Sequence, residues 1–260
     1  MPKTDRRNNP TAEAPLLEHL EELRTRIFWA LGFLLVGTVI AWTYKDDLIR
    51  LFQVPLASVR KGLIISTYGL TDQLFIAFSV SLWGGFVLAL PFILYQLWKF
   101  IEPGLTNTEQ RWAVPFVLGA GLAFGLGCLF CFEVILPAAV PFLIGFLGPS
   151  TGITPQLDIA KYIGDVLTYL VVFGIIFELP IIAFLLTKIG LVTATLLRSV
   201  RRYAIVVLLV AAAIITPTAD PLNLMLMAVP MYLLYELGVL VSGWAAPRKA
   251  RVQEMGEIEI

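Results

Sequence analysis

The sequence predicts an all-α, polytopic membrane protein with six transmembrane helices. Of its 260 residues, 58% are hydrophobic and 15% are charged, whereas an ordinary soluble domain is about half apolar and about a quarter charged. The charged residues gather in short clusters, and most stretches between them reach the roughly 17–25 residues that a helix needs to cross a bilayer. The chain therefore has no room for a folded soluble domain.

The N-terminal part is predicted to be a tail followed by a helix at the membrane surface. Residues 1–15 are polar and proline-rich, which indicates a disordered cytoplasmic tail. Apolar side chains then follow one helical face at Leu16, Leu20, Leu23 and Ile27. Charged residues occupy the other faces, as is typical of an amphipathic interfacial helix. This helix continues into the first span, about residues 27–44, which we interpret as retained because no small-residue cleavage site follows it.

Five further apolar runs predict the remaining spans. They cover about residues 73–98, 112–136, 162–187, 203–216 and 222–244. The fifth run corresponds to about 21 Å of helix, well short of a hydrocarbon core of about 30 Å, so it is expected to thin the bilayer locally. Residues 45–72 are predicted to be a loop, and residues 137–161 a longer loop with partial helices. The six-helix domain spans residues 16–244, and residues 245–260 form a charged cytoplasmic tail.

Lys and Arg are divided unequally between the two sides of these spans. Fourteen of the nineteen lie on the side of the N-terminus and five on the other. Because cytoplasmic loops carry the excess of positive charge, both termini are predicted to be cytoplasmic. The chain lacks an acid-poor transit peptide, which favours the cytoplasmic (inner) membrane of a prokaryote over an organelle. A formal net charge of zero gives no indication of nucleic-acid binding.

The sequence contains no signature of an enzyme, a metal site or a cofactor site. The phosphate-binding loop and the common metalloprotease and serine-hydrolase motifs do not occur. Cys128 and Cys131 form a C-x-x-C inside an apolar run, where two buried small hydrophobic residues are a simpler explanation than a redox or metal motif. His19 is the single histidine. We therefore expect no catalytic residue, no metal and no cofactor.

Glu178 lies unusually deep in a predicted span, thirteen residues after Asp165 and ten before Lys188. A carboxylate at this depth costs at least about 2.5–3.5 kcal/mol, and such residues usually mark a pathway or a site. The alternative is a protonated acid that is hydrogen-bonded to a neighbouring helix. Glu178 also raises a competing hypothesis, a proton-coupled secondary transporter. Such transporters usually contain inverted repeats, and the two halves of this chain do not match.

Three other acids have local explanations that spacing alone favours. Glu22 is placed to pair with Arg26 at i,i+4. Glu109 completes the capping-box pattern Thr106-x-x-Glu109 at the start of the third span. Asp220 precedes a proline and can cap the sixth helix.

Several motifs occur in order over residues 16–243. They are His19-Leu20-Glu21-Glu22-Leu23-Arg24, Pro91-x-x-x-Tyr95-Gln96-x-Trp98, Phe100-Ile101-Glu102-Pro103-Gly104-Leu105 running to Glu109-x-Arg111, Phe173-Gly174-x-x-Phe177-Glu178-x-Pro180, Thr216-Pro217 with Asp220, and Pro230-Met231-Tyr232. Together they resemble the TatC family, the multispanning subunits of the twin-arginine protein translocase. The resemblance covers the whole membrane region and implies six spans in a cupped arrangement.

The resemblance implies a receptor and core subunit that binds the signal peptides of folded exported proteins through their consecutive arginines. The binding groups correspond to Glu22 and Glu109, and Arg24 belongs to the same signature. A guanidinium matches a carboxylate bidentately and an ammonium does not, so two arginines at a partly desolvated surface require two acids. Transport in this family uses the proton-motive force, which agrees with the missing nucleotide site.

The resemblance also assigns roles within the membrane and at the outer face. The acid at Glu178 is expected on a concave, lipid-facing surface, where it hydrates or thins the bilayer or meets a polar group of the single-span partners TatA and TatB. Asp220 and Asn223 are candidate partner contacts in the last external turn, which is one residue longer than in some relatives and leaves the register of Asn223 open. Self-association in a receptor complex is also implied, and a passive scaffold is a third possible function.

Overall fold

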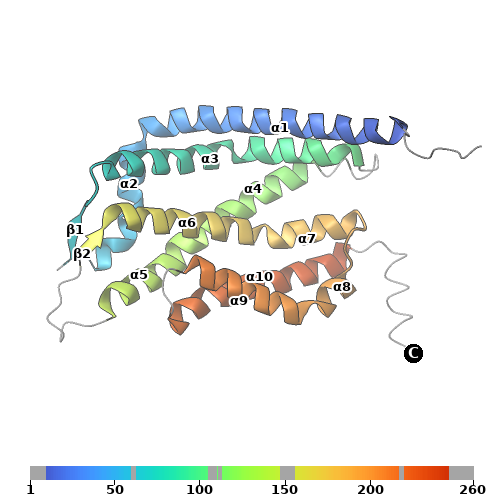
Figure 1. The fold of residues 1–260 in the computed structure, drawn as a ribbon. Coiled ribbons are helices and arrows are strands. Elements are labelled where there is room, and N and C mark those ends of the chain that lie inside the picture. Colours follow the sequence, from blue (N-terminus) through green and yellow to red (C-terminus); the bar gives the residue numbers. More distant parts are fainter. Residues whose placement is uncertain are drawn as a thin grey trace, which may run out of the picture.

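In the computed structural model, the described chain is almost entirely helical (Figure 1). The structure describes residues 10–59, 63–104, 110, 113–146, 156–216 and 220–245. The principal helices are α1 (Pro10–Thr43), α3 (Asp72–Ile101), α4 (Ala113–Phe130), α6 (Ile159–Phe177), α7 (Leu179–Lys188), α9 (Arg201–Ile215) and α10 (Pro221–Ala245). Shorter helices are α2 (Lys45–Phe52), α5 (Leu136–Gly145) and α8 (Ala194–Ser199), with 3₁₀ segments Val54–Ser58 and Glu102–Gly104 and a π-helix, Cys131–Ile135.

Five segments of the described chain are long and apolar enough to cross a membrane. They are His19–Thr43, Asp72–Ile101, Ala113–Gly145, Ile159–Lys188 and Pro221–Trp244. The predicted short fifth run is present as α9, whose 15 residues give only about 22 Å of helix. The prediction of a helical, multi-pass membrane protein is confirmed, and α9 is the apolar helix that stays below spanning length.

The first helix is longer than the sequence predicted. Residues 10–15 belong to α1 rather than to a disordered tail, and the surface helix continues into the first span without a break, as predicted. Pro10 suits the first turn of a helix because its missing N–H would have no helical acceptor there. The remainder of the predicted tail, residues 1–9, lies outside the described residues.

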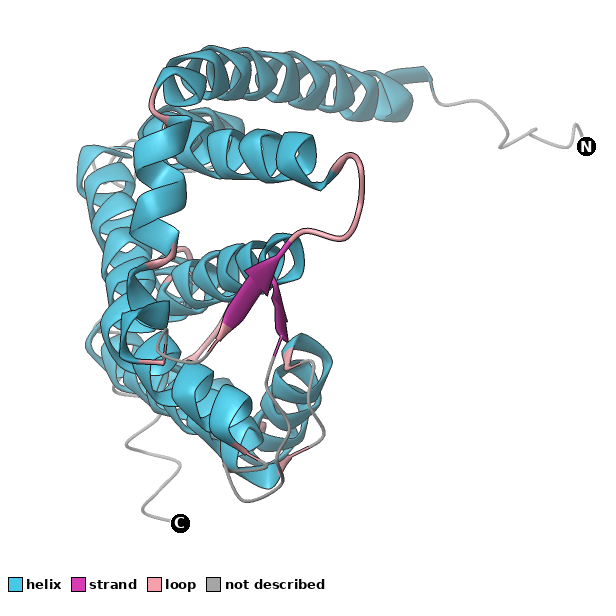
Figure 2. Ribbon diagram, turned by 90° about the vertical axis from the view of Figure 1, so that its left-hand side faces the viewer, coloured by secondary structure: helices cyan, strands magenta, loops and turns pink. Residues whose placement is uncertain are grey.

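Helix α1 lies along α3 at one edge of the molecule (Figures 1 and 2). The two backbones come closest at two glycines: a Cβ placed on Gly37 would lie 2.5 Å from the carbonyl oxygen of Gly85. Nearby, the rings of Phe33 and Phe92 stack with centroids 4.9 Å apart. Most of the remaining described surface of α1 is exposed, so α3 provides its main packing partner.

The buried core is centred on α6, which packs against α4 and α3. At the crossing of α4 and α6, a Cβ on Gly127 would meet the backbone of Phe173 and Gly174, so only glycine allows this approach. Helix α10 packs along α7 and α9 on the other side. Figure 2 shows that the helices follow an open curve rather than a closed bundle, consistent with the expected cupped arrangement.

The segment predicted as a loop over residues 45–72 is partly ordered. It contains α2, a 3₁₀ turn and strand β1 (Ile64–Ser66), which pairs in parallel with β2 (Gln156–Asp158). The hydroxyl of Tyr162 donates a 2.9 Å hydrogen bond to the carbonyl of Phe52 and ties this segment to α6. In the second predicted loop, α5 is the expected partial helix, while residues 147–155 lie outside the described residues.

Candidate functional site

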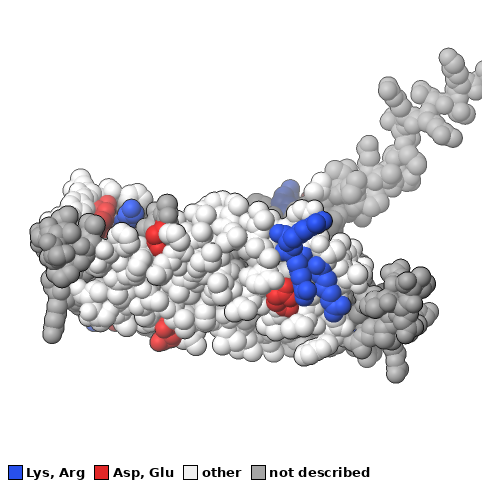
Figure 3. All heavy atoms as spheres, turned by 90° about the horizontal axis from the view of Figure 1, so that it is seen from below, with Lys and Arg blue, Asp and Glu red and all other residues white. Residues whose placement is uncertain are grey.

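Basic side chains concentrate at one end of the molecule. Seven of the ten Lys and Arg residues with described side chains lie at the end where α1 begins and α3 and α7 finish. They are Arg24, Arg26, Lys99, Lys188, Arg198, Arg201 and Arg202. Figure 3 shows some of these side chains gathered toward that end of the helices. We call it the basic end.

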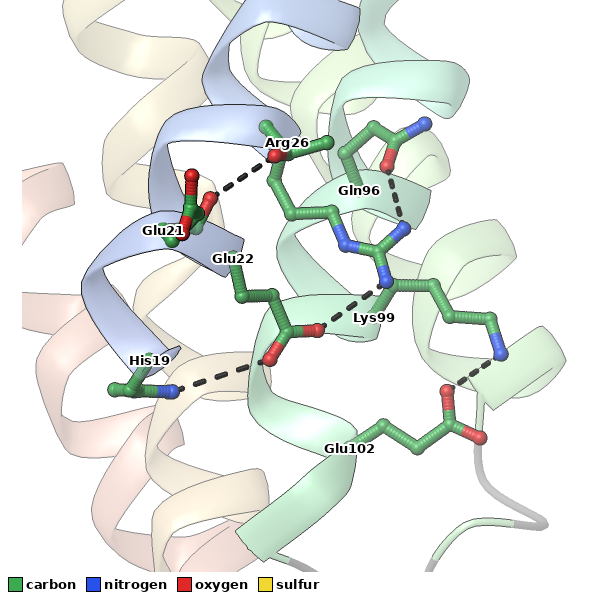
Figure 4. Close-up of polar contacts among 8 residues, drawn as sticks. His19, Glu21, Glu22, Arg26, Gln96, Lys99 and Glu102 are labelled. Atoms are coloured by element: carbon green, nitrogen blue, oxygen red, sulfur yellow. Dashed lines mark hydrogen bonds and ion pairs between the residues drawn. The ribbon is translucent and has the colours of Figure 1, made fainter. Parts of the chain in front are cut away.

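At the basic end, Glu22 lies on the side of α1 that faces α3 (Figure 4). Its Oε1 atom lies 3.2 Å from Nη2 of Arg26, and its Oε2 atom lies 4.0 Å from Nδ1 of His19. The side chain of Glu22 is 29% exposed and that of Arg26 is 30% exposed. The i,i+4 pair expected from spacing is therefore present, in a partly desolvated position where charge pairs are less screened than on an open surface.

Helix α3 completes this cluster with residues that the sequence reasoning had not assigned to it. Nη1 of Arg26 donates a 3.4 Å hydrogen bond to Oε1 of Gln96. The His19 ring stacks on Phe100 with centroids 4.4 Å apart and an interplanar angle of 18°. Arg26 thus bridges Glu22 and Gln96, and the two helices hold the Glu22 carboxylate in a defined position. In the sequence, Gln96 and Phe100 each lie within one of the ordered motifs, and this position was the signal that could have indicated a role for them in the site.

The structure does not bring Arg24 into this cluster. The Arg24 side chain is 69% exposed and pairs with Glu21, itself 71% exposed, at 3.5 Å. Residues two apart on a helix do not face the same side, so Arg24 and Glu22 point in different directions. The other predicted site acid, Glu109, lies outside the described residues, as does the proposed Thr106–Glu109 capping box.

The described residues that flank the segment 105–109 lie close to the end of α3. Lys99 pairs with Glu102 at 2.7 Å. The side chain of Gln110 donates a 3.4 Å hydrogen bond to the carbonyl of Glu102. The chain on both sides of Glu109 is therefore tied to the same end of α3 that contributes Gln96 and Phe100.

Glu178 occupies the junction between α6 and α7, within one apolar segment, Ile159–Lys188. Its carbonyl still accepts a 2.8 Å hydrogen bond from the N–H of Ile182, so the helical path continues past Pro180. The Oε1 atom is buried and has no hydrogen-bond partner among the described residues. A hollow of about 490 Å³ lies between α1, α3 and α6; Val171, two turns before Glu178, is among its lining residues, and Glu178 is not.

Asp220 and Asn223 form a local unit at the start of α10. Oδ1 of Asp220 accepts a 2.8 Å hydrogen bond from the backbone N–H of Asn223, and Oδ2 accepts one of 2.9 Å from its side-chain amide. Pro221 follows as the first helical residue. The expected cap is confirmed. Asn223 is 2% exposed, so much of this pair is buried within the molecule.

The family model for Sec-independent protein translocase protein (TatC) matches residues 18–230 of this chain. The chain belongs to the TatC family. A TatC protein from Deinococcus radiodurans is 49% identical over 236 residues, covering 89% of this chain and 86% of the relative. A TatC protein from Aquifex aeolicus is 39% identical, covering 92% of this chain and 99% of the relative.

A crystal structure of a twin-arginine translocase receptor, TatC, has the same fold. It superimposes with a TM-score of 0.78 at 39% identity and covers 87% of this chain and 99% of the crystallised chain. The chain is therefore a TatC-type component of the twin-arginine translocase, and its relatives are named as translocase proteins rather than as enzymes. None of the matched relatives supports the secondary-transporter hypothesis for Glu178.

Proposed function

We propose that this chain is the receptor for twin-arginine signal peptides, with Glu22 and Glu109 as the two acids that bind the arginine pair. The observation that carries the proposal is the position of Glu22. Its carboxylate is partly desolvated, fixed on one side by Arg26 and bordered by His19 and Phe100. Among the described residues, its Oε2 atom has only the long 4.0 Å approach of His19, which leaves that oxygen for an incoming guanidinium.

We propose Glu109 as the second acid because the residue that follows it in the chain, Gln110, lies at the end of α3. Consecutive Cα atoms are about 3.8 Å apart, and Gln110 is hydrogen-bonded to Glu102 at the end of α3. Glu109 is thus connected to the helix end that also contributes Phe100 to the Glu22 cluster. Two adjacent guanidinium groups call for two carboxylates, because each guanidinium presents a planar fork that an ammonium lacks.

The proposal is tested by site-specific crosslinking of a labelled signal peptide in membranes. A peptide with Arg-Arg is compared with a Lys-Lys peptide on the unmodified protein and on the Glu22→Gln and Glu109→Gln variants. A hydrogen bond to a charged group contributes about 1.5–3 kcal/mol, so each variant should weaken Arg-Arg binding by about tenfold to a hundredfold. The Lys-Lys peptide should bind weakly to all three proteins.

The neighbouring acid provides a matched control. Glu21 has the same chemistry one residue away, but it is 71% exposed and faces Arg24. Glu21→Gln should therefore bind the Arg-Arg peptide as the unmodified protein does. Equal crosslinking of the Glu21, Glu22 and Glu109 variants would mean that these acids serve only local pairing and capping, and the receptor proposal would be wrong.

We further propose that the basic end is cytoplasmic and that both termini lie on that side of a prokaryotic inner membrane. The seven-to-three division of the described Lys and Arg residues between the two ends supports this orientation. Recruitment of TatA and TatB, self-association in a receptor complex and transport driven by the proton-motive force belong to the same proposal. Asp220, at the opposite end, remains a candidate partner contact, with the buried Asn223 holding its carboxylate in position, and the exposed Arg24 is a candidate second contact for the peptide.

A further inference from the structure

An apolar cavity of about 260 Å³ lies between α3, α4, α7 and α10, away from the Glu22 cluster. Trp98 contributes from α3, Phe116 and Gly119 from α4, and Ile181 from α7. Lys188, the last residue of α7, is the one charged residue among the described residues that line it. The translocase function described above leaves this cavity without a role.

The cavity lies at the depth of a membrane interface. Trp98 is in the last turn of α3, Phe116 in the first turn of α4, and Lys188 at the end of α7, all at the basic end. Trp and Lys characteristically occupy this level, where lipid esters and phosphates lie. The apolar walls extend from there along α7 toward Ile181, which is about 10 Å from Lys188 along the helix axis.

Trp98 belongs to the wall of the cavity. Its side chain is fully buried, and its indole N–H has almost no accessible surface and no hydrogen-bond partner among the described residues. The indole therefore serves here as part of the apolar wall rather than as a hydrogen-bond donor to a ligand.

We propose that this cavity binds one acyl chain of an anionic phospholipid, with Lys188 near the phosphate. The size of the cavity decides against a protein occupant, since an α-helix is about 10 Å across and the space amounts to about 260 Å³. The positive charge at this end of the molecule indicates which lipid headgroup is preferred. Lys188 stands at an end that holds seven of the ten described Lys and Arg residues, which favours an anionic over a zwitterionic lipid.

The test uses the full-length protein reconstituted in vesicles that contain a phospholipid with a photoreactive acyl chain. Phosphatidylglycerol is compared with phosphatidylcholine, and crosslinked peptides from α4 and α7 are counted by mass spectrometry. One cationic residue near the surface changes anionic-lipid binding by about fivefold. We therefore expect the excess of phosphatidylglycerol over phosphatidylcholine in the cavity to be about fivefold smaller in Lys188→Gln than in the unmodified protein.

A pair of glycines on α4 gives a matched test of the cavity itself. A Cβ on Gly119 would meet Ile181 at an ordinary 3.8 Å, so Gly119→Leu fills the cavity without a backbone clash. A Cβ on Gly121 would meet nothing within 4 Å, so Gly121→Leu is the control on the same helix. We expect Gly119→Leu to lose the crosslinks and Gly121→Leu to keep them.

Three results would overturn the proposal. Equal crosslinking of the two lipids to the unmodified protein would show that the cavity does not select lipids by headgroup charge. Undiminished crosslinking in a folded Gly119→Leu would place the lipid elsewhere. A copurifying polypeptide crosslinked at these peptides would identify a different occupant. Lys188→Gln leaves the cavity walls intact. The comparison of phosphatidylglycerol with phosphatidylcholine on this variant therefore still tests the proposal if the Gly119 variant does not fold.

Discussion

Two neighbouring acids on α1 show how strongly position determines what a charged residue does. Glu21 and its partner Arg24 are both about 70% exposed, and ion pairs of that kind contribute only about 0–1 kcal/mol. Glu22 is less than half as exposed and belongs to a network that includes a residue of α3. The pairing of Glu22 with Arg26 is therefore compatible with a receptor role, because it orients the carboxylate before any peptide arrives.

The cap formed by Asp220 allows its structural role to be separated from a partner contact. Asp220→Ala removes the acceptor for the N–H of Asn223 and should lower stability by about 1 kcal/mol. Asp220→Asn keeps an acceptor and should cost less than about 0.5 kcal/mol. Thermal unfolding of the detergent-solubilised variants measures the difference.

Copurification of the single-span subunits provides the second readout for the same variants. If the charge of Asp220 contacts a partner, Asp220→Asn should reduce copurification while leaving the unfolding midpoint almost unchanged. If both variants unfold as the unmodified protein does, the cap does not stabilise α10, and this account of Asp220 is wrong.

Local contacts at these sites could be predicted from the sequence, whereas contacts between helices could not. The Glu22–Arg26 pair and the Asp220 cap both follow from spacings of three or four residues. The hydrogen bond from Arg26 to Gln96 joins residues 70 apart, and its prediction would have required the packing register of α1 on α3. Arg24 was grouped with Glu22 by proximity in the sequence, although the helical turn separates them.

At the scale of elements, the position of α1 depends on one close contact with α3. A Cβ on Gly85 would collide with the backbone and hydroxyl of Thr38 in α1. Because Glu22 belongs to α1 and Gln96 to α3, any change in this crossing moves the two halves of the candidate site relative to each other.

Replacing Gly85 by alanine should therefore separate the two helices. Overpacking of this kind costs about 1–3 kcal/mol, and we expect a lower unfolding midpoint together with weaker crosslinking of the Arg-Arg peptide. Gly32→Ala, in α1 on the other side of the same helix pair, is the control, because a Cβ there meets nothing within 4 Å. Equal behaviour of the two variants would show that the glycine contact does not position α1.

Composition predicted the spans well because length and apolarity are properties of a single segment. The short α9 was recognised in this way. The sequence missed the ordered part of residues 45–72, because strand β1 exists only through its pairing with β2, some 90 residues later. It also ended the third span at residue 136, whereas the π-helix Cys131–Ile135 continues directly into α5 despite Pro137.

For the molecule as a whole, two features point to a disturbed bilayer near its open side. Helix α9 has 15 residues, about 22 Å of helix against a core of about 30 Å, and a mismatch of this size is relieved by local thinning. Glu178 adds a carboxylate, one oxygen of which is buried and has no partner among the described residues, inside the apolar segment Ile159–Lys188. Both features favour local thinning and hydration of the bilayer.

The variants Glu178→Gln and Glu178→Leu distinguish a polar role for this residue from a proton pathway. A carboxyl group with one buried, unpartnered oxygen inside an apolar segment is costly, so Glu178→Leu should raise the unfolding midpoint and yet slow the transport of a twin-arginine precursor into membrane vesicles. Glu178→Gln still binds water and should keep at least about half of the rate, since its amide remains polar. Glu133→Leu, at an exposed acid of the third span, is the control and should transport normally. If Gln is as defective as Leu, the ionisable proton itself is required, and the hydration role proposed for Glu178 is wrong.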